Sequence, residues 1–291
     1  MQRNRTVVKV QIAQHAGFCF GVRKAVEIAR DTARRAGTLY MLGDIVHNKS
    51  VVEELAAEGV VVVNSLDEVE NGPVLFRAHG TPKRTWDEAK ERGLEIIDAT
   101  CPLVRKIHEE VRELAEEGRQ IYIIGDKGHD EVVGIMSQVD DAIVLSSPAE
   151  VKGLRRQRRG GVVVQSTQLI TNVRQIVQEL MMKVYDLRVI NTICQPTRDH
   201  QTEIRPLAEN NDLVIVVGSH TSANTGRMTD IARGINSRTY QVEGQDDIDP
   251  DWFAGIERVG IHAGASTPDH VIQSVLRRIE SFSPEYRIIE A

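Results

Sequence analysis

The sequence is poor in the features that mark several common protein classes. It has only three cysteines in 291 residues and no C-x-x-C pair, and aromatic residues make up 4% of the chain. Zinc fingers, zinc ribbons and the usual ferredoxin spacing are therefore disfavoured. No apolar run approaches the roughly 18–20 residues that cross a membrane, and the first residues lack the apolar core of a signal peptide. We expect a cytoplasmic protein without a membrane partner.

Long blocks of one charge are also absent. The net charge is −6, and the strongest basic cluster is "KGLRRQRRGG" at 152–161. A basic patch binds nucleic acid when its side chains share one face of the protein and aromatic or polar side chains lie beside them. We interpret this cluster as a solvated loop before a strand, so no nucleic-acid partner is expected.

The stretch "GSHTSANTG" does not match G-x-G-x-x-G after a first strand, so no nicotinamide site is predicted.

The chain does contain an internal repeat. A cysteine ends each of three apolar runs, in "VVKVQIAQHAGFCFGV", "LEIIDATCPLV" and "LRVINTICQPT". A second run then ends at a glycine, and each glycine number exceeds its cysteine number by 24: Gly43, Gly125 and Gly218 against Cys19, Cys101 and Cys194. A fixed offset that recurs three times indicates three copies of one structural unit.

Each copy alternates strands with helices. Apolar residues recur at helical spacing after the first cysteine up to about Gly37 and after the second up to Gly118, while the third helix, about 198–210, is the weakest. Third and fourth strands follow in each copy. The predicted fold is α/β, with small parallel sheets in three pseudo-threefold-related lobes, 7–93, 94–186 and 187–281, and a C-terminal tail, 282–291.

Three cysteines in equivalent positions predict a shared centre. In parallel sheets the ligand lies beyond the carboxyl ends of the strands, where these cysteines stand. Three converging thiolates can hold zinc with an open fourth position, or three corners of a cubic iron–sulfur cluster. The residue types alone leave both metals open.

Polar side chains occupy the other strand ends. Most are hydrogen-bond donors, which together with helix N-termini suit an anion, and one is acidic. Singly, each is explained as a cap or a turn residue. Their common register favours a phosphate or diphosphate pocket built from His47, Asn48, His79, His129, Glu131, Ser166, Thr167, Ser222, Asn224 and Ser266.

With these residues in view, the chain resembles the 4-hydroxy-3-methylbut-2-enyl diphosphate reductase family over roughly residues 8–280. The motifs that carry the resemblance are "GFCFGVRKAV", "VHNKSVVEEL", "RAHGTP", "DATCPLV", "GDKGHDEVVG", "TIC", "VVGSHTSANT" and "HAGAST". The resemblance implies a cloverleaf of three lobes around a 4Fe–4S cluster. It implies reductive dehydroxylation of the allylic diphosphate to isopentenyl and dimethylallyl diphosphate, with electrons from a ferredoxin or flavodoxin.

The resemblance also implies residue roles. Cys19, Cys101 and Cys194 match the cluster ligands, with one iron left open. Glu131 matches the proton donor, and His129 and Ser166 match groups near the substrate hydroxyl, with Thr167 beside them. The diphosphate contacts match His47, His79, Ser222, Asn224 and Ser266.

Four positions depart from the usual family pattern. Ser166 replaces a common threonine and keeps the hydroxyl, whereas Ala223 replaces a common serine and loses one side-chain contact. Asp130 replaces a common proline, from which we expect a looser turn. His200 stands where arginine is frequent and receives no role.

Two other functions stay open at this point. One is a cluster-binding sensor or scaffold without turnover, and the other is a zinc hydrolase that uses the same cysteines. A sensor has no need of an acid such as Glu131 with His129 beside an open iron. Metal analysis separates the zinc enzyme from the other two.

Overall fold

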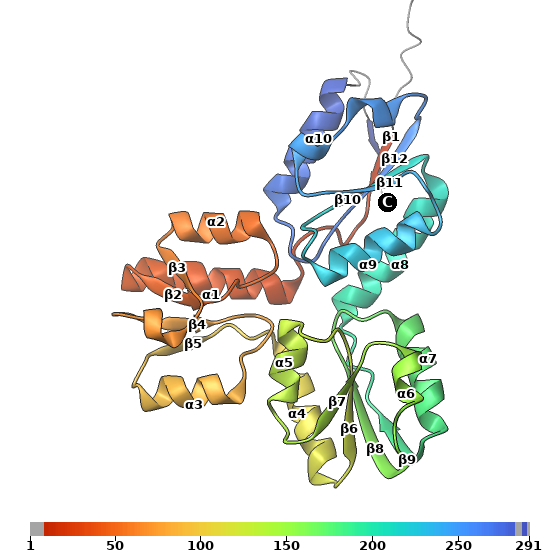
Figure 1. Cartoon of the computed structure of the whole chain (residues 1–291). Helices are drawn as coiled ribbons and strands as arrows, with labels where there is room; N and C mark the ends of the chain where they lie inside the picture. Colours follow the sequence, from red (N-terminus) through yellow and green to blue (C-terminus); the bar gives the residue numbers. More distant parts are fainter. Residues whose placement is uncertain (1–8, 283–286, 290–291) are drawn as a thin grey trace, which may run out of the picture. The chain divides into compact units, whose positions relative to one another are not determined.

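The computed structural model describes residues 9–282 and 287–289. The start of the first expected lobe and parts of the expected tail lie outside the described residues. The strands form three sheets, of five, four and four strands, and every described strand pair is parallel (Figure 1). The predicted α/β class with small parallel sheets is confirmed. The described residues include no helix long and apolar enough to cross a membrane.

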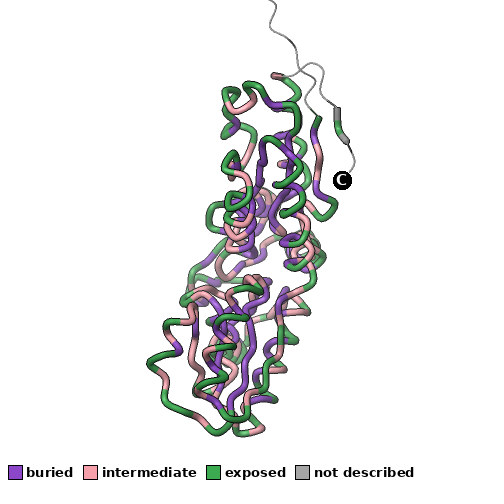
Figure 2. Tube along the Cα trace, turned by 90° about the vertical axis from the view of Figure 1, so that its right-hand side faces the viewer, coloured by how far each residue is buried: buried purple, intermediate pink, exposed green. Residues whose placement is uncertain are grey.

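The chain divides into two compact units. The central unit comprises Gly21–Val46 and Val52–Cys194, and the C-terminal unit comprises Met1–Phe20, His47–Val51 and Gln195–Ala291. Two of the sheets belong to the central unit and the third to the C-terminal unit. Figure 2 shows buried residues in the interior of each unit, and the strand segments Val74–Phe76 and Leu213–Val217 are buried throughout.

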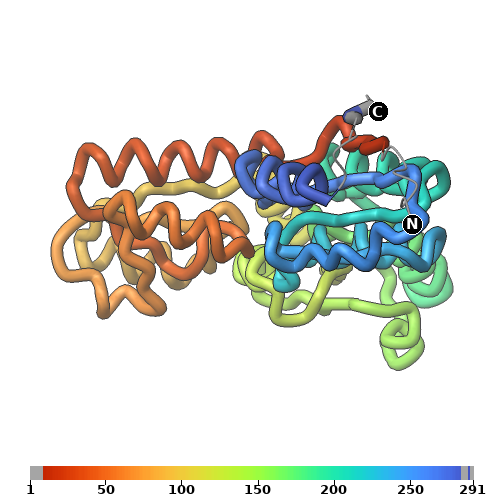
Figure 3. Tube along the Cα trace, turned by 90° about the horizontal axis from the view of Figure 1, so that it is seen from above, coloured from red at the N-terminus to blue at the C-terminus, as the bar shows by residue number. Residues whose placement is uncertain are grey.

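The first sheet has the order β3-β2-β4-β5. Its strands are β2 (Leu39–Leu42), β3 (Val60–Val63), β4 (Val74–Phe76) and β5 (Ile96–Asp98), and its helices are α1 (Phe20–Ala36), α2 (Lys49–Ala57), α3 (Lys83–Glu91) and the 3-10 turn η1 (Leu66–Glu68). The long helix α1 runs alongside this sheet (Figure 3). It ends just before Gly37, as the periodicity predicts, and buries Val26, Ala29 and Ala33.

The second sheet has the order β7-β6-β8-β9. Its elements are α4 (Pro102–Glu116), β6 (Gln120–Ile124), α5 (Asp130–Met136), β7 (Ala142–Leu145), α6 (Pro148–Val151), β8 (Gln157–Val164), α7 (Ile170–Met181) and β9 (Val184–Val189). Alternate residues of β6 face opposite ways, as expected for a strand. Tyr122 and Ile124 pack with α7, while Ile121 and Ile123 pack with α4 and α5.

The third sheet has the order β11-β10-β12-β1-β13. Its elements are β1 (Lys9–Ile12), α8 (Gln195–Asn210), β10 (Leu213–Val217), α9 (Ala223–Arg233), β11 (Thr239–Val242), η2 (Gln245–Asp247), η3 (Pro250–Phe253), β12 (Arg258–Ala263), α10 (Asp269–Phe282) and β13 (Arg287–Ile289). One face of the central strand β10 packs with α10 and the other with α8 and α9. Strand β13 pairs with β1 where the sequence analysis expects a tail.

The strand that leads each expected lobe pairs with the last strand of another lobe. β5 pairs with β4, β9 with β8, and β1 with β12. The three sheets consequently share one strand order, with β13 as an addition to the third. In Figure 1 the red strand β1 lies among the blue strands of the C-terminal unit. The lobe boundaries at 93 and 186 stay a prediction.

The repeated glycines occupy equivalent places. Each follows the last residue of its strand, after β2, β6 and β10. Their backbone N–H groups donate to the last carbonyl of the neighbouring strand, at 2.8, 3.1 and 2.8 Å, from Gly43 to Val63, from Gly125 to Leu145 and from Gly218 to Val242. The backbone approaches its neighbours closely there, since a Cβ on Gly125 would lie 2.6 Å from the Val132 side chain. The cysteine-to-glycine offset of 24 residues therefore reflects one backbone geometry that occurs three times in the chain.

The basic cluster at 152–161 differs in part from its interpretation as a loop. Strand β8 begins at Gln157, so Arg158 and Arg159 lie within the strand, where both are exposed. Arg159 contacts Asp186 on the adjacent strand β9, and Asp186 also accepts a hydrogen bond from Arg119 at 3.0 Å. Arg159 therefore contributes to contacts within the second sheet.

Three histidines are buried in the two units, and they make stability depend on pH. Burial lowers the pKa of His108 and His200 to about 4 and that of His262 to about 3, from an ordinary value of 6.5. The unfolded chain takes up protons below pH 6.5 while the folded chain does not. The contribution of these histidines to the free energy of unfolding is therefore fully present above that pH and is lost as the pH falls toward 4. The loss is about 2 kcal/mol for each histidine at pH 5.

Thermal unfolding followed by circular dichroism at pH 7 and pH 5 tests this expectation. The melting temperature should be lower at pH 5 than at pH 7. The difference should be smaller in His108→Gln, which removes one of the three buried histidines. An unchanged melting temperature in the wild type would contradict it.

Candidate active site

The three cysteines form no disulfide with one another and are half-buried, and they occupy equivalent positions. Each directly precedes a helix, α1, α4 or α8. Each backbone N–H donates to the carbonyl two residues beyond the end of a neighbouring strand: Cys19 to Ala265 at 3.1 Å, Cys101 to Ala78 at 3.0 Å and Cys194 to Ser166 at 3.0 Å. The repeat predicted from sequence thus extends to the backbone contacts of each cysteine. The thiolate form of a cysteine is favoured at a helix N-terminus. All three cysteines are therefore suitable ligands for a metal centre that prefers sulfur.

Glu131 is the buried acid of the central unit. It lies in the first turn of α5 and is only 2% exposed. Its Oε1 accepts the Ser166 backbone N–H at 2.6 Å and its Oε2 accepts the Ser166 hydroxyl at 2.7 Å. The Ser166 carbonyl in turn accepts the Cys194 N–H. Glu131, Ser166 and Cys194 therefore form one continuous chain of hydrogen bonds.

His129 and His79 lie beside this acid. His129 caps α5, and its Nδ1 accepts the Glu131 backbone N–H at 3.2 Å, so the proton of the neutral ring is on Nε2. The rings of His79 and His129 meet edge to face with centroids 5.7 Å apart. The structure thus brings four predicted residues of the central unit together, although they come from three separate turns.

Gln165 is a member of this group that the sequence analysis missed. It is fully buried, its Oε1 accepts the Asp126 N–H at 2.8 Å, and its Nε2 donates to the predicted residue Thr167 at 3.1 Å. It thereby ties the turn after β6 to the turn after β8. The available signal was a polar residue directly after the apolar run of "GVVVQSTQ".

The predicted phosphate contacts of the C-terminal unit lie at the ends of β10 and β12. Ser222 caps α9, where its hydroxyl accepts the Thr225 N–H at 3.3 Å, and Ser266 follows β12 one residue after Ala265, the partner of Cys19. Asn224 is 5% exposed, and neither polar atom of its side-chain amide has a hydrogen-bond partner. Unpaired buried amides are rare in proteins, so Asn224 has the character of a ligand-binding residue.

His47 and Asn48 lie just before α2, in the short segment assigned to the C-terminal unit. Asn48 is buried, and its Oδ1 accepts the Val51 N–H at 3.4 Å. This is an ordinary capping contact, which agrees with a helix-entry role for Asn48. The role of His47 toward a substrate stays a prediction.

The expectation of a loose turn at Asp130 is wrong. The carboxylate of Asp130 accepts two hydrogen bonds from the guanidinium of Arg77, both at 2.8 Å. Arg77 lies in the "RAHGTP" turn after β4, so the pair ties that turn to the start of α5. A bidentate arginine–carboxylate pair is directional and comparatively strong. The departure from proline therefore adds a contact here and does not leave the turn unsupported.

A double-mutant cycle of Arg77→Gln and Asp130→Asn measures this contact. The two side chains form a bidentate pair with good geometry. We therefore expect a coupling free energy of about 1 kcal/mol or more between the two substitutions in chemical unfolding. Additivity of the two single variants to within about 0.3 kcal/mol would show that the pair contributes nothing.

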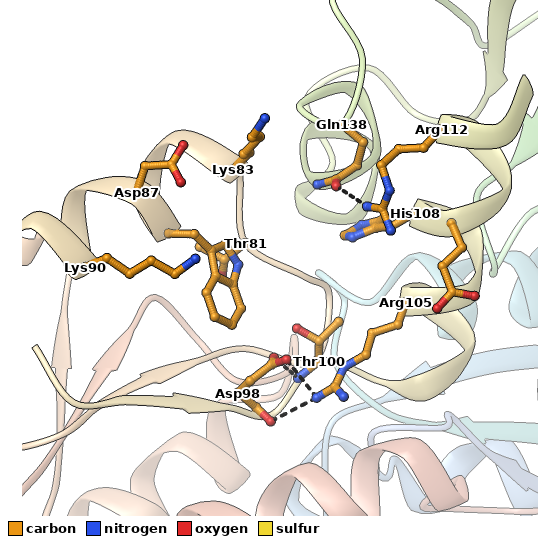
Figure 4. Close-up of a pocket in the computed structure, with 12 residues that line it drawn as sticks. Thr81, Lys83, Asp87, Lys90, Asp98, Thr100, Arg105, His108, Arg112 and Gln138 are labelled. Carbon is orange, nitrogen blue, oxygen red and sulfur yellow. Dashed lines mark hydrogen bonds and ion pairs between the residues drawn. The ribbon is translucent and has the colours of Figure 1, made fainter. Parts of the chain in front are cut away.

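A cleft of about 430 Å³ lies in the central unit between α3 and α4 (Figure 4). None of the predicted site residues lines it, although Thr100, which precedes Cys101, does. Several of its charges are already satisfied, since Arg105 pairs with Asp98 at 2.7 Å and Arg112 donates to Gln138 at 2.6 Å. The cleft is therefore separate from the residues assembled above.

Comparison with known proteins gives a consistent result. The LytB protein family matches residues 10–280. A 4-hydroxy-3-methylbut-2-enyl diphosphate reductase of Geobacter sulfurreducens is 39% identical over 276 residues, covering 94% of this chain and 98% of its own. The enzyme of the same name from Aquifex aeolicus is 37% identical over 279 residues, covering 94% and 96%.

Solved structures agree. A structure of (E)-4-hydroxy-3-methyl-but-2-enyl diphosphate reductase, described as the terminal enzyme of the non-mevalonate pathway, has 37% identity and a TM-score of 0.72, covering 94% of this chain and 99% of that one. The E-1-hydroxy-2-methyl-but-2-enyl-4-diphosphate reductase of Plasmodium falciparum has 27% identity and a TM-score of 0.92, covering 98% and 92%.

Proposed function

This chain belongs to the LytB protein family, and we propose that its own residues perform the reductive dehydroxylation of 4-hydroxy-3-methylbut-2-enyl diphosphate to isopentenyl and dimethylallyl diphosphate. Relatives that bear this reductase name align with the chain over nearly their whole length. The reaction takes up two electrons and two protons and releases water. The chain must therefore bind a diphosphate, hold an electron-transfer group and supply a proton beside the hydroxyl that leaves.

Cys19, Cys101 and Cys194 are proposed to hold a 4Fe–4S cluster. The equivalent backbone contacts of the three cysteines and their places at helix N-termini support this set. When bound, a cluster with three protein thiolates has one iron open, which supplies a Lewis acid for the hydroxyl and a route for the electrons. Zinc lacks redox chemistry and is the weaker candidate for a reductase.

Glu131 is proposed to supply the proton, and the single observation that carries the proposal is its contact with Ser166. The serine hydroxyl can donate to the carboxylate or accept a proton from the carboxylic acid, so the pair can pass a proton without moving apart. The contact of Ser166 with Cys194 links this pair to a proposed cluster ligand. His129 holds the start of α5 through its Nδ1, and its neutral ring carries the proton on Nε2.

Ser222, Asn224 and Ser266 are proposed to bind the diphosphate, together with His47 and His79. The unpaired amide of Asn224 and the N-terminus of α9 offer donors to an anion. A diphosphate oxygen would accept a hydrogen bond from the buried amide nitrogen of Asn224. We also propose a ferredoxin or flavodoxin as electron donor, and the cytoplasm as the compartment, since a reducing environment preserves thiolate ligands.

The test is anaerobic purification followed by iron and sulfide counting, with Mössbauer spectra before and after addition of the allylic diphosphate. About four irons per chain, with one iron site altered by the substrate, are expected. Zinc in place of iron would favour the hydrolase. A cluster that does not respond to the diphosphate would favour the sensor.

A further inference from the structure

Three histidines and a glutamate of the C-terminal unit gather outside the predicted site residues. His15 lies in the turn between β1 and Cys19, His200 and Glu203 lie on α8, and His262 lies on β12. Three different segments of the unit therefore meet at this cluster. His200 and His262 are 1% and 0% exposed, so the group reaches from the surface into the interior.

Glu203 makes two contacts with His15. Its Oε2 accepts the His15 backbone N–H at 3.0 Å, and its Oε1 contacts His15 Nδ1 at 2.5 Å. His15 is four residues before Cys19. One carboxylate thus fixes both the backbone and the ring of the residue from which the cysteine turn starts.

His262, on β12, lies near the same carboxylate. Its Nδ1 contacts the Ala263 N–H at 2.8 Å and the Ala263 carbonyl oxygen at 3.2 Å, and its Nε2 lies 3.7 Å from Glu203 Oε2, beyond hydrogen-bond distance. The carbonyl of Ala263 accepts the Gly17 N–H at 3.4 Å, and that of Ala265 accepts the Cys19 N–H. The end of β12 therefore supports the cysteine turn from one side while Glu203 holds it from the other.

His200 completes the cluster. It stands one helical turn before Glu203 on α8, and its ring centroid is 5.0 Å from that of His262. Its Nδ1 is buried without a hydrogen-bond partner. Both rings remain neutral because burial lowers their pKa. The carboxylate of Glu203 therefore contacts the exposed His15 and lies near the neutral ring of His262.

We infer that Glu203 is a positioning residue that sets the turn carrying Cys19 against α8 and the end of β12. The inference rests on the proposed function in that Cys19 is taken as a cluster ligand. It does not need Glu203 to touch the substrate. Its effect reaches the chemistry through the Sγ of Cys19 and through the adjoining turn that carries Ser266.

The first experiment needs no metal and measures thiol reactivity in the full chain after removal of any iron. Alkylation of each cysteine by iodoacetamide is followed by peptide mass spectrometry. In Glu203→Ala the alkylation rate of Cys19 should rise about tenfold, the scale on which outer supporting contacts act. Cys101 and Cys194 belong to the other unit and serve as internal references, and Glu209→Gln, an exposed glutamate on the same helix, is the matched control.

A second measurement uses the holoprotein. Release of iron to a chelator should be about tenfold faster in Glu203→Ala than in the wild type and intermediate in Glu203→Gln, which keeps an acceptor for the His15 N–H. The midpoint potential from an EPR titration should shift in both variants and stay unchanged in Glu209→Gln. His15→Asn, which removes the ring that pairs with Glu203, should reproduce the Cys19 result if Glu203→Ala fails to fold.

The outcomes separate this inference from the proposed function. Equal acceleration of all three cysteines, or of none, would overturn the positioning role. A wild-type chain that binds no iron would overturn the cluster, and the alkylation rates would still decide the role of Glu203.

Discussion

Glu131→Gln is expected to lower kcat by about 10²–10⁴-fold while leaving iron content and substrate binding unchanged. The carboxylate holds the N–H and the hydroxyl of Ser166 at 2.6 and 2.7 Å. A glutamine carbonyl can accept the N–H, but its amide cannot release a proton to a leaving hydroxyl. Geometry is therefore largely retained and proton transfer is lost.

The measurement is steady-state turnover with a chemical reductant, beside iron and sulfide analysis of the same preparations. Glu109→Gln, an exposed glutamate of α4, is the matched control and should turn over normally. Ser166→Ala should share the defect, whereas Ser166→Thr keeps the hydroxyl and should retain most activity. Unchanged turnover in Glu131→Gln would remove this residue from the mechanism.

Cys101→Ser is expected to abolish activity and to reduce iron from about four atoms per chain to a small fraction of that. A hydroxyl is a poor ligand for iron where a thiolate is required. Serine is a favourable residue at the N-cap position that Cys101 holds on α4, so the helix itself should persist. Circular dichroism should consequently match the wild type.

The same substitution at Cys19 or Cys194 should give the same loss, because the three cysteines have equivalent backbone contacts. Iron, sulfide and zinc are counted in all three variants. Full iron and full activity in Cys101→Ser would contradict a cluster held by the three cysteines. Loss of zinc in place of iron would point to the hydrolase.

Sequence patterns captured the parts of the fold that are set locally. The apolar runs that end at Gly43, Gly125 and Gly218 are strands that stop one residue earlier, and the helix predicted up to Gly37 is α1. These signals are strong because a close approach of backbone to its neighbours admits only glycine at such a turn. The equivalent places of the three cysteines follow from the same local repeat.

Contacts between distant segments were not visible in the sequence. Nothing local indicates that β1 joins β12, because a short apolar strand can pair with any open edge. Glu203 and His15 are 188 residues apart, and Arg77 and Asp130 are 53 apart. The prediction for Asp130 failed for this reason, since it considered the backbone freedom of one residue and not the arginine that meets it.

The pairing of β1 with β12 also determines when the C-terminal unit can be completed during synthesis. The two strands are about 250 residues apart, and a ribosome adding roughly 5–20 residues per second separates them by about 10–50 s. Throughout that interval β1 lacks a partner strand, and Cys19 lacks the carbonyl of Ala265. We therefore expect nascent chains to need protection at their first strand, and iron–sulfur insertion to follow release from the ribosome.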